Sequence, residues 1–221
     1  MGRPEDKYVK LPAVIHATRL GYSYHSIRDK ISGLDWDADT NIFYEQFKQG
    51  LEKVNGKQFN NEQIEFFIQE LKIKLNAEDI GRAFFKALQK GLGDIKLIDF
   101  ENSDNNLFHV VTELPYVCGD DSFRPDITFL INGMPLAFME AKRQNNKEGI
   151  LAERARMATR FSKSIYRNFV NITQLMVFSN NQEYDDEERL PIHGSFYASS
   201  AYGEPSFSRF REERSSYVDK S

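Results

Sequence analysis

One aspartate, one glutamate and one lysine lie at the ends of two neighbouring apolar segments. Asp126 precedes the run ITFLI, residues 127–131, and Glu140 and Lys142 end the run MPLAFMEAK, residues 134–142. Alternation along a strand places Glu140 and Lys142 on one face, and burying both charges costs several kcal/mol unless another interaction compensates. A divalent cation would compensate, because it keeps a carboxylate ionised and lets the amine lie beside a cation-bound water. The three residues therefore predict metal-assisted hydrolysis.

A shared cation requires Asp126 and Glu140 to lie on the same face of the hairpin. With a plain two-residue turn at Asn132 and Gly133, Asp126 would pair with Met139, and Glu140 would lie on the opposite face. An odd-length loop or one bulged residue corrects the register, and Gly133 can adopt the left-handed conformation that a bulged turn requires. We therefore predict a bulge in this hairpin.

The same residues also have a purely structural interpretation. Asp126 could cap a turn after Pro125, and Glu140 and Lys142 could pair with each other on an edge strand. The D-x13-E-x-K spacing is short enough to occur by chance. On spacing alone, both interpretations stay open.

The spacing of apolar residues along the chain changes near residue 92. Residues 1–92 are predicted to be mainly helical, because apolar residues recur at steps of three and four. Residues 93–200 are predicted to form the catalytic sheet and one helix, with strands at 95–100, 107–114, the hairpin, 172–180 and 194–200. This order predicts an α/β fold of the α+β type, a mixed β-sheet flanked by helices with a helical N-terminal region.

Size and composition agree with one globular domain over residues 1–221. The chain is 40% hydrophobic, and residues 201–221 are polar, as expected for the start of a linker to a further region. No run approaches the ~18 apolar residues of a membrane span, and no signal-peptide core is present, so we expect a cytoplasmic protein. The single cysteine, Cys118, excludes an internal disulfide.

The net charge of −4 argues against nucleic-acid binding by bulk electrostatics. Five acids, however, crowd into residues 183–188, so the remainder of the surface is close to neutral and permits a local basic patch.

The string RPDITFLINGMPLAFMEAKR, residues 124–143, resembles the N-terminal PD-(D/E)xK nuclease domain of the type I restriction endonuclease R (restriction) subunit. It is similar to that family's run of RPD, strand, NG-PL, strand and ExK. KLPAVIHATRLGY at 10–22, QLMVFSNN at 174–181 and GSFY at 194–197 resemble further parts of the same domain. The likeness is strongest from about residue 107 to 200.

This resemblance implies a restriction-endonuclease-like fold and Mg²⁺-dependent cleavage of double-stranded DNA, the activity of a type I site-specific deoxyribonuclease. It makes Asp126 and Glu140 metal ligands and assigns to Lys142 the positioning or polarising of the attacking water. The carbonyl of Ala141 would be a further ligand. Glu5 lies where the family carries one more acid.

The resemblance also implies partners, namely DNA and the modification and specificity subunits of a type I restriction complex. ATP would serve only a motor region that follows the nuclease in that family, because no phosphate-binding GxxxxGK[ST] loop occurs in this sequence. The alternatives are a stand-alone DNA repair nuclease and a catalytically silent nuclease-fold module for DNA binding or assembly.

The helix predicted at about 147–167 departs from the family pattern. Met157 and Phe161 stand where the family often has glutamine and tyrosine. The predicted buried stripe is Leu151, Ala155, Ala158, Phe161 and Ile165, and the opposite stripe is Glu153, Arg156, Arg160, Lys163 and Arg167. We predict that Arg156 and Arg160, continued by Lys163, contact a DNA phosphate or support the metal-binding carboxylates.

Overall fold

The computed structural model describes residues 6–27, 35–143, 149–182, 195–198 and 208–209. Glu5 and most of the predicted linker, 201–221, lie outside these ranges. No helix in the part of the chain that is described is long and apolar enough to cross a membrane.

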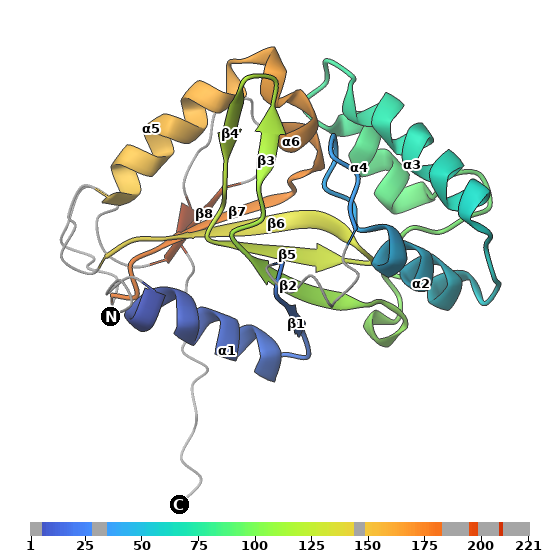
Figure 1. Cartoon of the computed structure of the whole chain (residues 1–221), viewed down its shortest axis with the longest axis horizontal. Helices are drawn as coiled ribbons and strands as arrows, with labels where there is room; N and C mark the ends of the chain where they lie inside the picture. Colours follow the sequence, from blue (N-terminus) through green and yellow to red (C-terminus); the bar gives the residue numbers. More distant parts are fainter. Residues whose placement is uncertain (1–5, 28–34, 144–148, 183–194, 199–207, 210–221) are drawn as a thin grey trace, which may run out of the picture.

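A mixed sheet of seven strands forms the centre of the described structure, in the order β1-β2-β5-β6-β7-β8-β9 (Figure 1). Strands β2, β5 and β6 are antiparallel neighbours, whereas β1 runs parallel to β2 and β7 parallel to β6. The mixed sheet predicted from the order of elements is therefore confirmed. Its strands are β1 (Ser23–His25), β2 (Phe108–Thr112), β5 (Ile127–Ile131), β6 (Met134–Ala141), β7 (Leu175–Ser179), β8 (Ser195–Ala198) and β9 (Ser208–Arg209).

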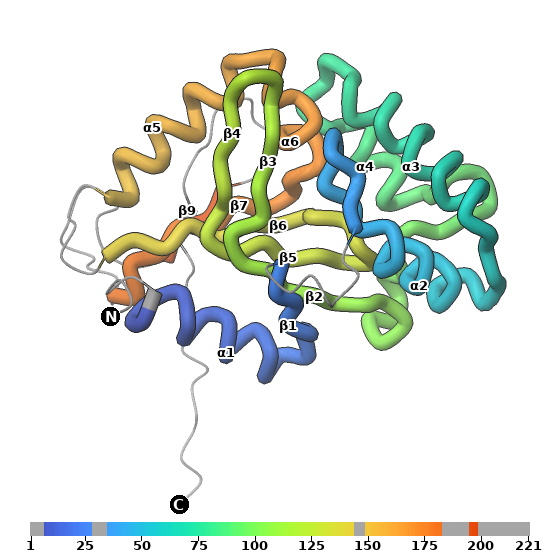
Figure 2. The backbone as a smooth tube through the Cα atoms, in the orientation of Figure 1, coloured from blue at the N-terminus to red at the C-terminus, as the bar shows by residue number. Residues whose placement is uncertain are grey.

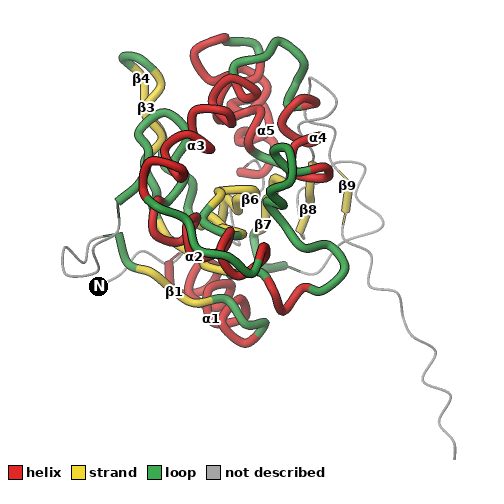
Figure 3. Tube along the Cα trace, turned by 90° about the vertical axis from the view of Figure 1, so that its right-hand side faces the viewer, coloured by secondary structure: helices red, strands yellow, loops and turns green. Residues whose placement is uncertain are grey.

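Helices cover both faces of this sheet. Helix α1 (Leu11–Arg19) continues the π-helical turn η1 (Asp6–Lys10) and lies on one side, and α5 (Gly149–Phe161) and α6 (Arg167–Ile172) lie on the other (Figures 1 and 3). A cluster of three helices, α2 (Tyr44–Asn55), α3 (Asn61–Leu75) and α4 (Arg82–Lys90), packs at the end of the sheet where β5 turns into β6. The helical first part of the chain therefore covers one face of the sheet with α1 and encloses the hairpin turn with α2, α3 and α4.

Two predicted features of the strand region were wrong. Residues 95–100 form no strand; Leu92 and Ile95 make one isolated bridge, and Leu97 is buried against the helices. Residues 116–123, to which the prediction assigned no strand, form a second hairpin, β3 (Tyr116–Cys118) and β4 (Asp121–Phe123). Figure 2 shows this hairpin rising from the sheet toward α5 and α6.

The β5–β6 hairpin contains the predicted bulge, but at a different position. Asn132 and Gly133 form a two-residue turn with φ angles of 48° and 74°. Leu130 pairs with Pro135 and Phe129 pairs with Ala137, so the intervening Leu136 is the extra residue. The bulge lies beside Pro135, which has no N–H and so cannot donate to a central ladder.

The hairpin turn is buried in the helical part of the chain. Asn132 is fully buried, and its amide nitrogen donates to the carbonyl of Leu97 at 2.8 Å, while its oxygen accepts from the Leu107 N–H at 2.7 Å. The Phe43 N–H donates to the carbonyl of Gly133 at 3.0 Å. These bonds fix the start of β6 and therefore the direction in which its far end points.

We expect Gly133→Ala to destabilise the fold strongly. Gly133 has a φ of +74°, and a Cβ there would lie 2.4 Å from the backbone nitrogen of Phe47. Gly119 also has a positive φ, +62°, but a Cβ there would meet nothing within 4 Å. Urea unfolding should therefore show a loss of more than ~2 kcal/mol for Gly133→Ala and only ~1 kcal/mol for Gly119→Ala. Equal losses would contradict the close packing of the turn.

Candidate active site

The predicted catalytic residues meet at one end of the sheet. The C-terminal end of β6 lies there beside the first turns of α1 and α5 (Figure 1). Ile127 pairs with Met139, so the next position along the ladder puts Asp126 opposite Glu140, on the same face. The Oδ2 atom of Asp126 accepts a hydrogen bond of 2.8 Å from the Ala141 N–H. The bulge therefore places Asp126 and Glu140 on the same face of the hairpin, as predicted.

Lys142 lies between two carboxylates. Its Nζ atom is 3.3 Å from Oε2 of Glu140 and 3.0 Å from Oε2 of Glu153 on α5. The edge-strand interpretation of this pair is wrong, because β6 lies between β5 and β7 and the Lys142 N–H extends that pairing to the carbonyl of Ser179 at 2.8 Å. The amine is thus held on a central strand, on the same face as Glu140.

Glu140 is a buried acid with a strongly perturbed affinity for protons. Only 7% of its surface is exposed, and this burial raises its pKa to about 8, with the charges of Glu153 and Asp126 adding to the effect and that of Lys142 opposing it. Burial acts to lower the pKa of Lys142, but the carboxylates of Glu140 and Glu153 outweigh it and raise that pKa. The surroundings therefore favour a positive charge beside Glu140.

Glu153 is a site residue whose position was not predicted. It is 3% exposed, and besides Lys142 it binds Arg156 at 2.8 Å and lies 3.6 Å from Arg160. The buried stripe predicted for the helix at 147–167 was wrong in part: Ala155 and Ile165 are exposed, and Ile165 lies beyond the end of α5. Ile150, Glu153 and Met157 are the residues of α5 that face the interior. The spacing of three and four residues from Ile150 to Glu153 to Met157 is the sequence signal that could have placed this acid inward.

The two arginines differ in their surroundings. The side chain of Arg156 is 64% exposed and reaches back to Glu153. That of Arg160 is 18% exposed, and its guanidinium lies 4.1 Å from the centre of the Phe123 ring. Both therefore support the buried carboxylate, and Arg156 is the one that also faces solvent.

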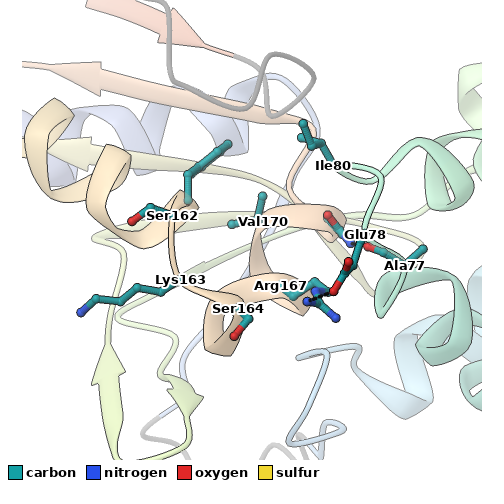
Figure 4. Close-up of a pocket in the computed structure, with 10 residues that line it drawn as sticks. Ala77, Glu78, Ile80, Ser162, Lys163, Ser164, Arg167 and Val170 are labelled. Atoms are coloured by element: carbon teal, nitrogen blue, oxygen red, sulfur yellow. Dashed lines mark hydrogen bonds and ion pairs between the residues drawn. The ribbon is translucent and has the colours of Figure 1, made fainter.

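Lys163 lies apart from the carboxylates. It lines a pocket of about 330 Å³ beyond the end of α5, together with residues of α6 and of the segment before α4 (Figure 4). In that pocket Arg167 pairs with Glu78 at 2.7 Å, and the Lys163 side chain points away from this pair. The structure therefore does not bring Lys163 to the predicted catalytic group.

Lys10 and Glu113 also adjoin the site, and sequence analysis selected neither. Lys10 is 9% exposed; its Nζ atom lies 3.3 Å from Oδ1 of Asp126 and also contacts the carboxylate of Glu113. Burial acts to lower the pKa of Lys10, but the hydrogen bond to Glu113 and the charges of Asp126 and Glu113 raise it. No local sequence signal distinguishes these residues, because the contact joins positions 103 residues apart.

The donor set fits a magnesium ion with few protein ligands. Within the described ranges, no group of three or more His, Cys, Asp or Glu is placed to hold a metal. Asp126 and Glu140 supply two carboxylates on one face, and Mg²⁺ is commonly held by one or two carboxylates together with water and phosphate oxygens. Ala141 is buried, and its carbonyl stays a predicted ligand. Glu5 lies outside the described residues.

Comparison with known proteins identifies the family. The family described as "Type I restriction enzyme R protein N terminus" matches residues 3–185. This chain belongs to that family.

Two curated relatives come from Methanocaldococcus jannaschii. One, provisionally named as the type I restriction enzyme MjaVIIIP endonuclease subunit, is 30% identical over 90 residues, which are 41% of this chain and 9% of the relative. The other, provisionally named as the MjaVIIP endonuclease subunit, is 37% identical over 76 residues, 33% of this chain and 7% of the relative. The chain therefore spans only a small part of the length of these relatives.

The raised pKa of Glu140 predicts how Glu140→Gln should change stability with pH. An acid whose pKa is raised to about 8 on folding keeps its proton longer in the folded state, so stability falls as pH rises from its ordinary pKa to about 8. The neutral amide lacks this dependence. In urea unfolding without divalent ions, Glu140→Gln should therefore gain up to ~1.4 kcal/mol per pH unit relative to the parent between pH 5 and 8.

Glu65, an exposed acid on α3, provides the control. Its replacement by glutamine changes a side chain that stays in contact with solvent, so its effect on the free energy of unfolding should vary far less over this interval than that of Glu140→Gln. A flat difference for Glu140→Gln would show that Glu140 is not the buried acid described above.

Proposed function

We propose that this domain is a Mg²⁺-dependent endonuclease that cleaves phosphodiester bonds of double-stranded DNA as part of a type I restriction-modification complex. The observation that carries the proposal is the convergence of Asp126, Glu140 and Lys142 on one face of the hairpin in a member of the R-subunit family. The perturbed proton affinity of Glu140 supports it, because such residues are concentrated at catalytic sites.

Asp126 and Glu140 would hold the ion. When bound, Mg²⁺ supplies Lewis acidity toward a non-bridging phosphate oxygen and stabilises the charge that develops during hydrolysis. The carboxylate of Asp126 is oriented by the Ala141 N–H, so its direction is set by the same strand that carries Glu140. A bound cation would favour the ionised form of Glu140 over the protonated acid.

Lys142 would hold and orient the attacking water. An ammonium has three donors, and Glu140 and Glu153 lie within reach of two of them. The remaining donor is the one assigned to water. Glu153 acts through Lys142 as a positioning residue, because its buried carboxylate keeps the amine charged and on the substrate side.

DNA contact is assigned chiefly to Arg156, with Arg160 supporting Glu153. Arg156 is exposed at the rim of the site, where a phosphate could replace part of its solvent shell. Recognition of the target sequence would reside in the specificity subunit, which would join this chain and the modification subunit in the complex. In this proposal residues 1–221 form one endonuclease domain, residues 201–221 lead toward an ATP-dependent motor, and ATP serves only that motor.

Variants of the three central residues test the function. Asp126→Ala and Glu140→Ala should each lower the cleavage of plasmid DNA by at least ~100-fold, because each removes a metal ligand. Lys142→Ala should lower cleavage similarly, yet leave Mg²⁺ binding measured by calorimetry largely intact. Lys86→Ala, on the exposed side of α4, is the control and should cut at the parent rate. A Glu140→Ala protein that cleaves as fast as the parent would refute the assignment.

Replacement of Glu153 tests its positioning role. Glu153→Gln keeps a hydrogen-bond acceptor for Lys142 but removes the charge that helps to raise the pKa of that amine. We expect a ~10-fold loss of cleavage and a decline at high pH that begins at lower pH than in the parent, since Lys142 would lose its proton earlier. Glu153→Asp should restore part of the pH profile. An unchanged profile for Glu153→Gln would argue for a structural role only.

A further inference from the structure

We propose that Lys10 takes the position of a second cation in this site, so that the domain works with a single divalent ion. The inference rests on the proposed function, because it concerns how many ions the nuclease site holds. In nuclease sites with two metals, the ions lie about 4 Å apart and a carboxylate commonly joins them. Asp126 is the acid at the centre of this site that could join two ions.

The two oxygens of Asp126 face different neighbours. Oδ2 accepts the Ala141 N–H at 2.8 Å, on the side of β6 where Glu140 and Lys142 lie. Oδ1 lies 3.3 Å from the ammonium of Lys10. One side of the aspartate is therefore directed toward the candidate metal ligands and the other toward an amine from the N-terminal helical segment.

A second carboxylate contacts that amine. Glu113 follows the end of β2, and its side chain contacts the same Lys10 ammonium. Its backbone N–H donates to the carbonyl of Asp126 at 3.2 Å, and its φ of 58° is a left-handed conformation that costs a residue with a side chain about 1–3 kcal/mol. The structure thus directs two carboxylates, Asp126 and Glu113, toward one positive charge.

The ammonium is fixed in place by its surroundings. The side chain of Lys10 is 11% exposed, and the preceding Val9 is 2% exposed. Ala17, two turns further along on α1, packs against Val110 and Ile127 of the sheet. The lysine is therefore part of a packed segment and not a mobile surface side chain.

This arrangement opposes a second divalent ion beside Asp126. Such an ion would need the Asp126 carboxylate and one more acid, and among the described residues Glu113 is an acid that contacts the same amine. Lys10 already uses an oxygen of each, and its positive charge would repel the incoming ion. On the opposite side of Asp126 the ammonium is that of Lys142, which lies 3.3 Å from Glu140 but is held more closely, at 3.0 Å, by Glu153 on α5. That ammonium uses no oxygen of Asp126 within hydrogen-bond distance among the contacts of the described residues, so this side of the aspartate stays available to an ion.

Counting bound ions tests the inference without relying on catalysis. Mn²⁺ is added to the chain in the absence of DNA, and the free ion is measured by electron paramagnetic resonance to give the number bound per chain. We expect one ion for the parent and two for Lys10→Met, in which Asp126 and Glu113 lose their shared amine. The double variant Lys10→Met/Glu113→Gln should return to one ion. Lys7→Met is the control, because Lys7 is an exposed lysine that lies 5.0 Å from the Tyr8 ring on the same segment.

The outcomes separate this inference from the proposed function. Two ions bound to the parent would overturn the role of Lys10 and leave the nuclease assignment standing. One ion in both the parent and a folded Lys10→Met protein would also overturn it. No ion bound to the parent would refute the metal assignment on which the proposed function rests, and the inference with it. The parent count decides the first and last of these even if Lys10→Met fails to fold.

Discussion

The candidate site depends on one residue of register in the β5–β6 hairpin. Side chains alternate between the faces of a strand, so a shift of one position moves every following side chain to the opposite face. With Leu136 as the extra residue, Asp126 and Glu140 share a face; without it, Asp126 would share a face with Met139. The apolar side chain of Met139 packs toward α1 and offers no oxygen to a cation. A single inserted residue thus determines whether two carboxylates can act together.

The helical first part of the chain stabilises this register. A two-residue turn sets the pairing at one end of the hairpin. Asn132 binds Leu97, in the segment after α4, and Gly133 accepts a hydrogen bond from Phe43, just before α2, and packs closely against the first turn of α2. Pro135 then forces the ladder to adjust within β6. The site lies at the other end of that strand. Because β6 is a continuous strand of eight residues, packing around the turn also fixes the position of the carboxylates at its far end.

Sequence analysis predicted the parts of the molecule whose signals are local. The alternation in β5, β6, β7 and β8, and the chemistry required of Asp126 and Glu140, were enough to predict both the mixed sheet and the need for a bulge. The position of the bulge was wrong because Pro135, which has no N–H, interrupts the ladder two residues beyond Gly133, where the extra residue Leu136 is accommodated.

Features that depend on distant contacts were missed. The β3–β4 hairpin is short, and its aromatic residues pack on Phe169 of α6, a contact that no local pattern discloses. The inward direction of Glu153 was not predicted because Glu153, Arg156 and Arg160 recur at steps of three and four, a pattern typical of a solvent-exposed helix face. The approach of Lys10 to Asp126 joins the first helical segment to the fifth strand, and only the folded chain brings them together.

The Lys142 ammonium is shared between two acids, Glu140 and Glu153, and this sharing determines how positive charge is distributed in the site. Lys142 lies closer to Glu153, at 3.0 Å, than to Glu140, at 3.3 Å, and Glu153 also binds Arg156. Glu140 therefore shares its ammonium with a closer acid, and burial raises its pKa to about 8. Asp126, by contrast, has Lys10 at 3.3 Å from one oxygen and a backbone N–H on the other.

A divalent cation would offset the cost of burying the Glu140 charge. It would meet a competing ammonium on the other side of Asp126. Because Glu153 holds the Lys142 ammonium at 3.0 Å, a cation would meet less competition on the face that Glu140 and Lys142 share. That is also the face on which a water held by Lys142 could approach a phosphate bound to the same ion.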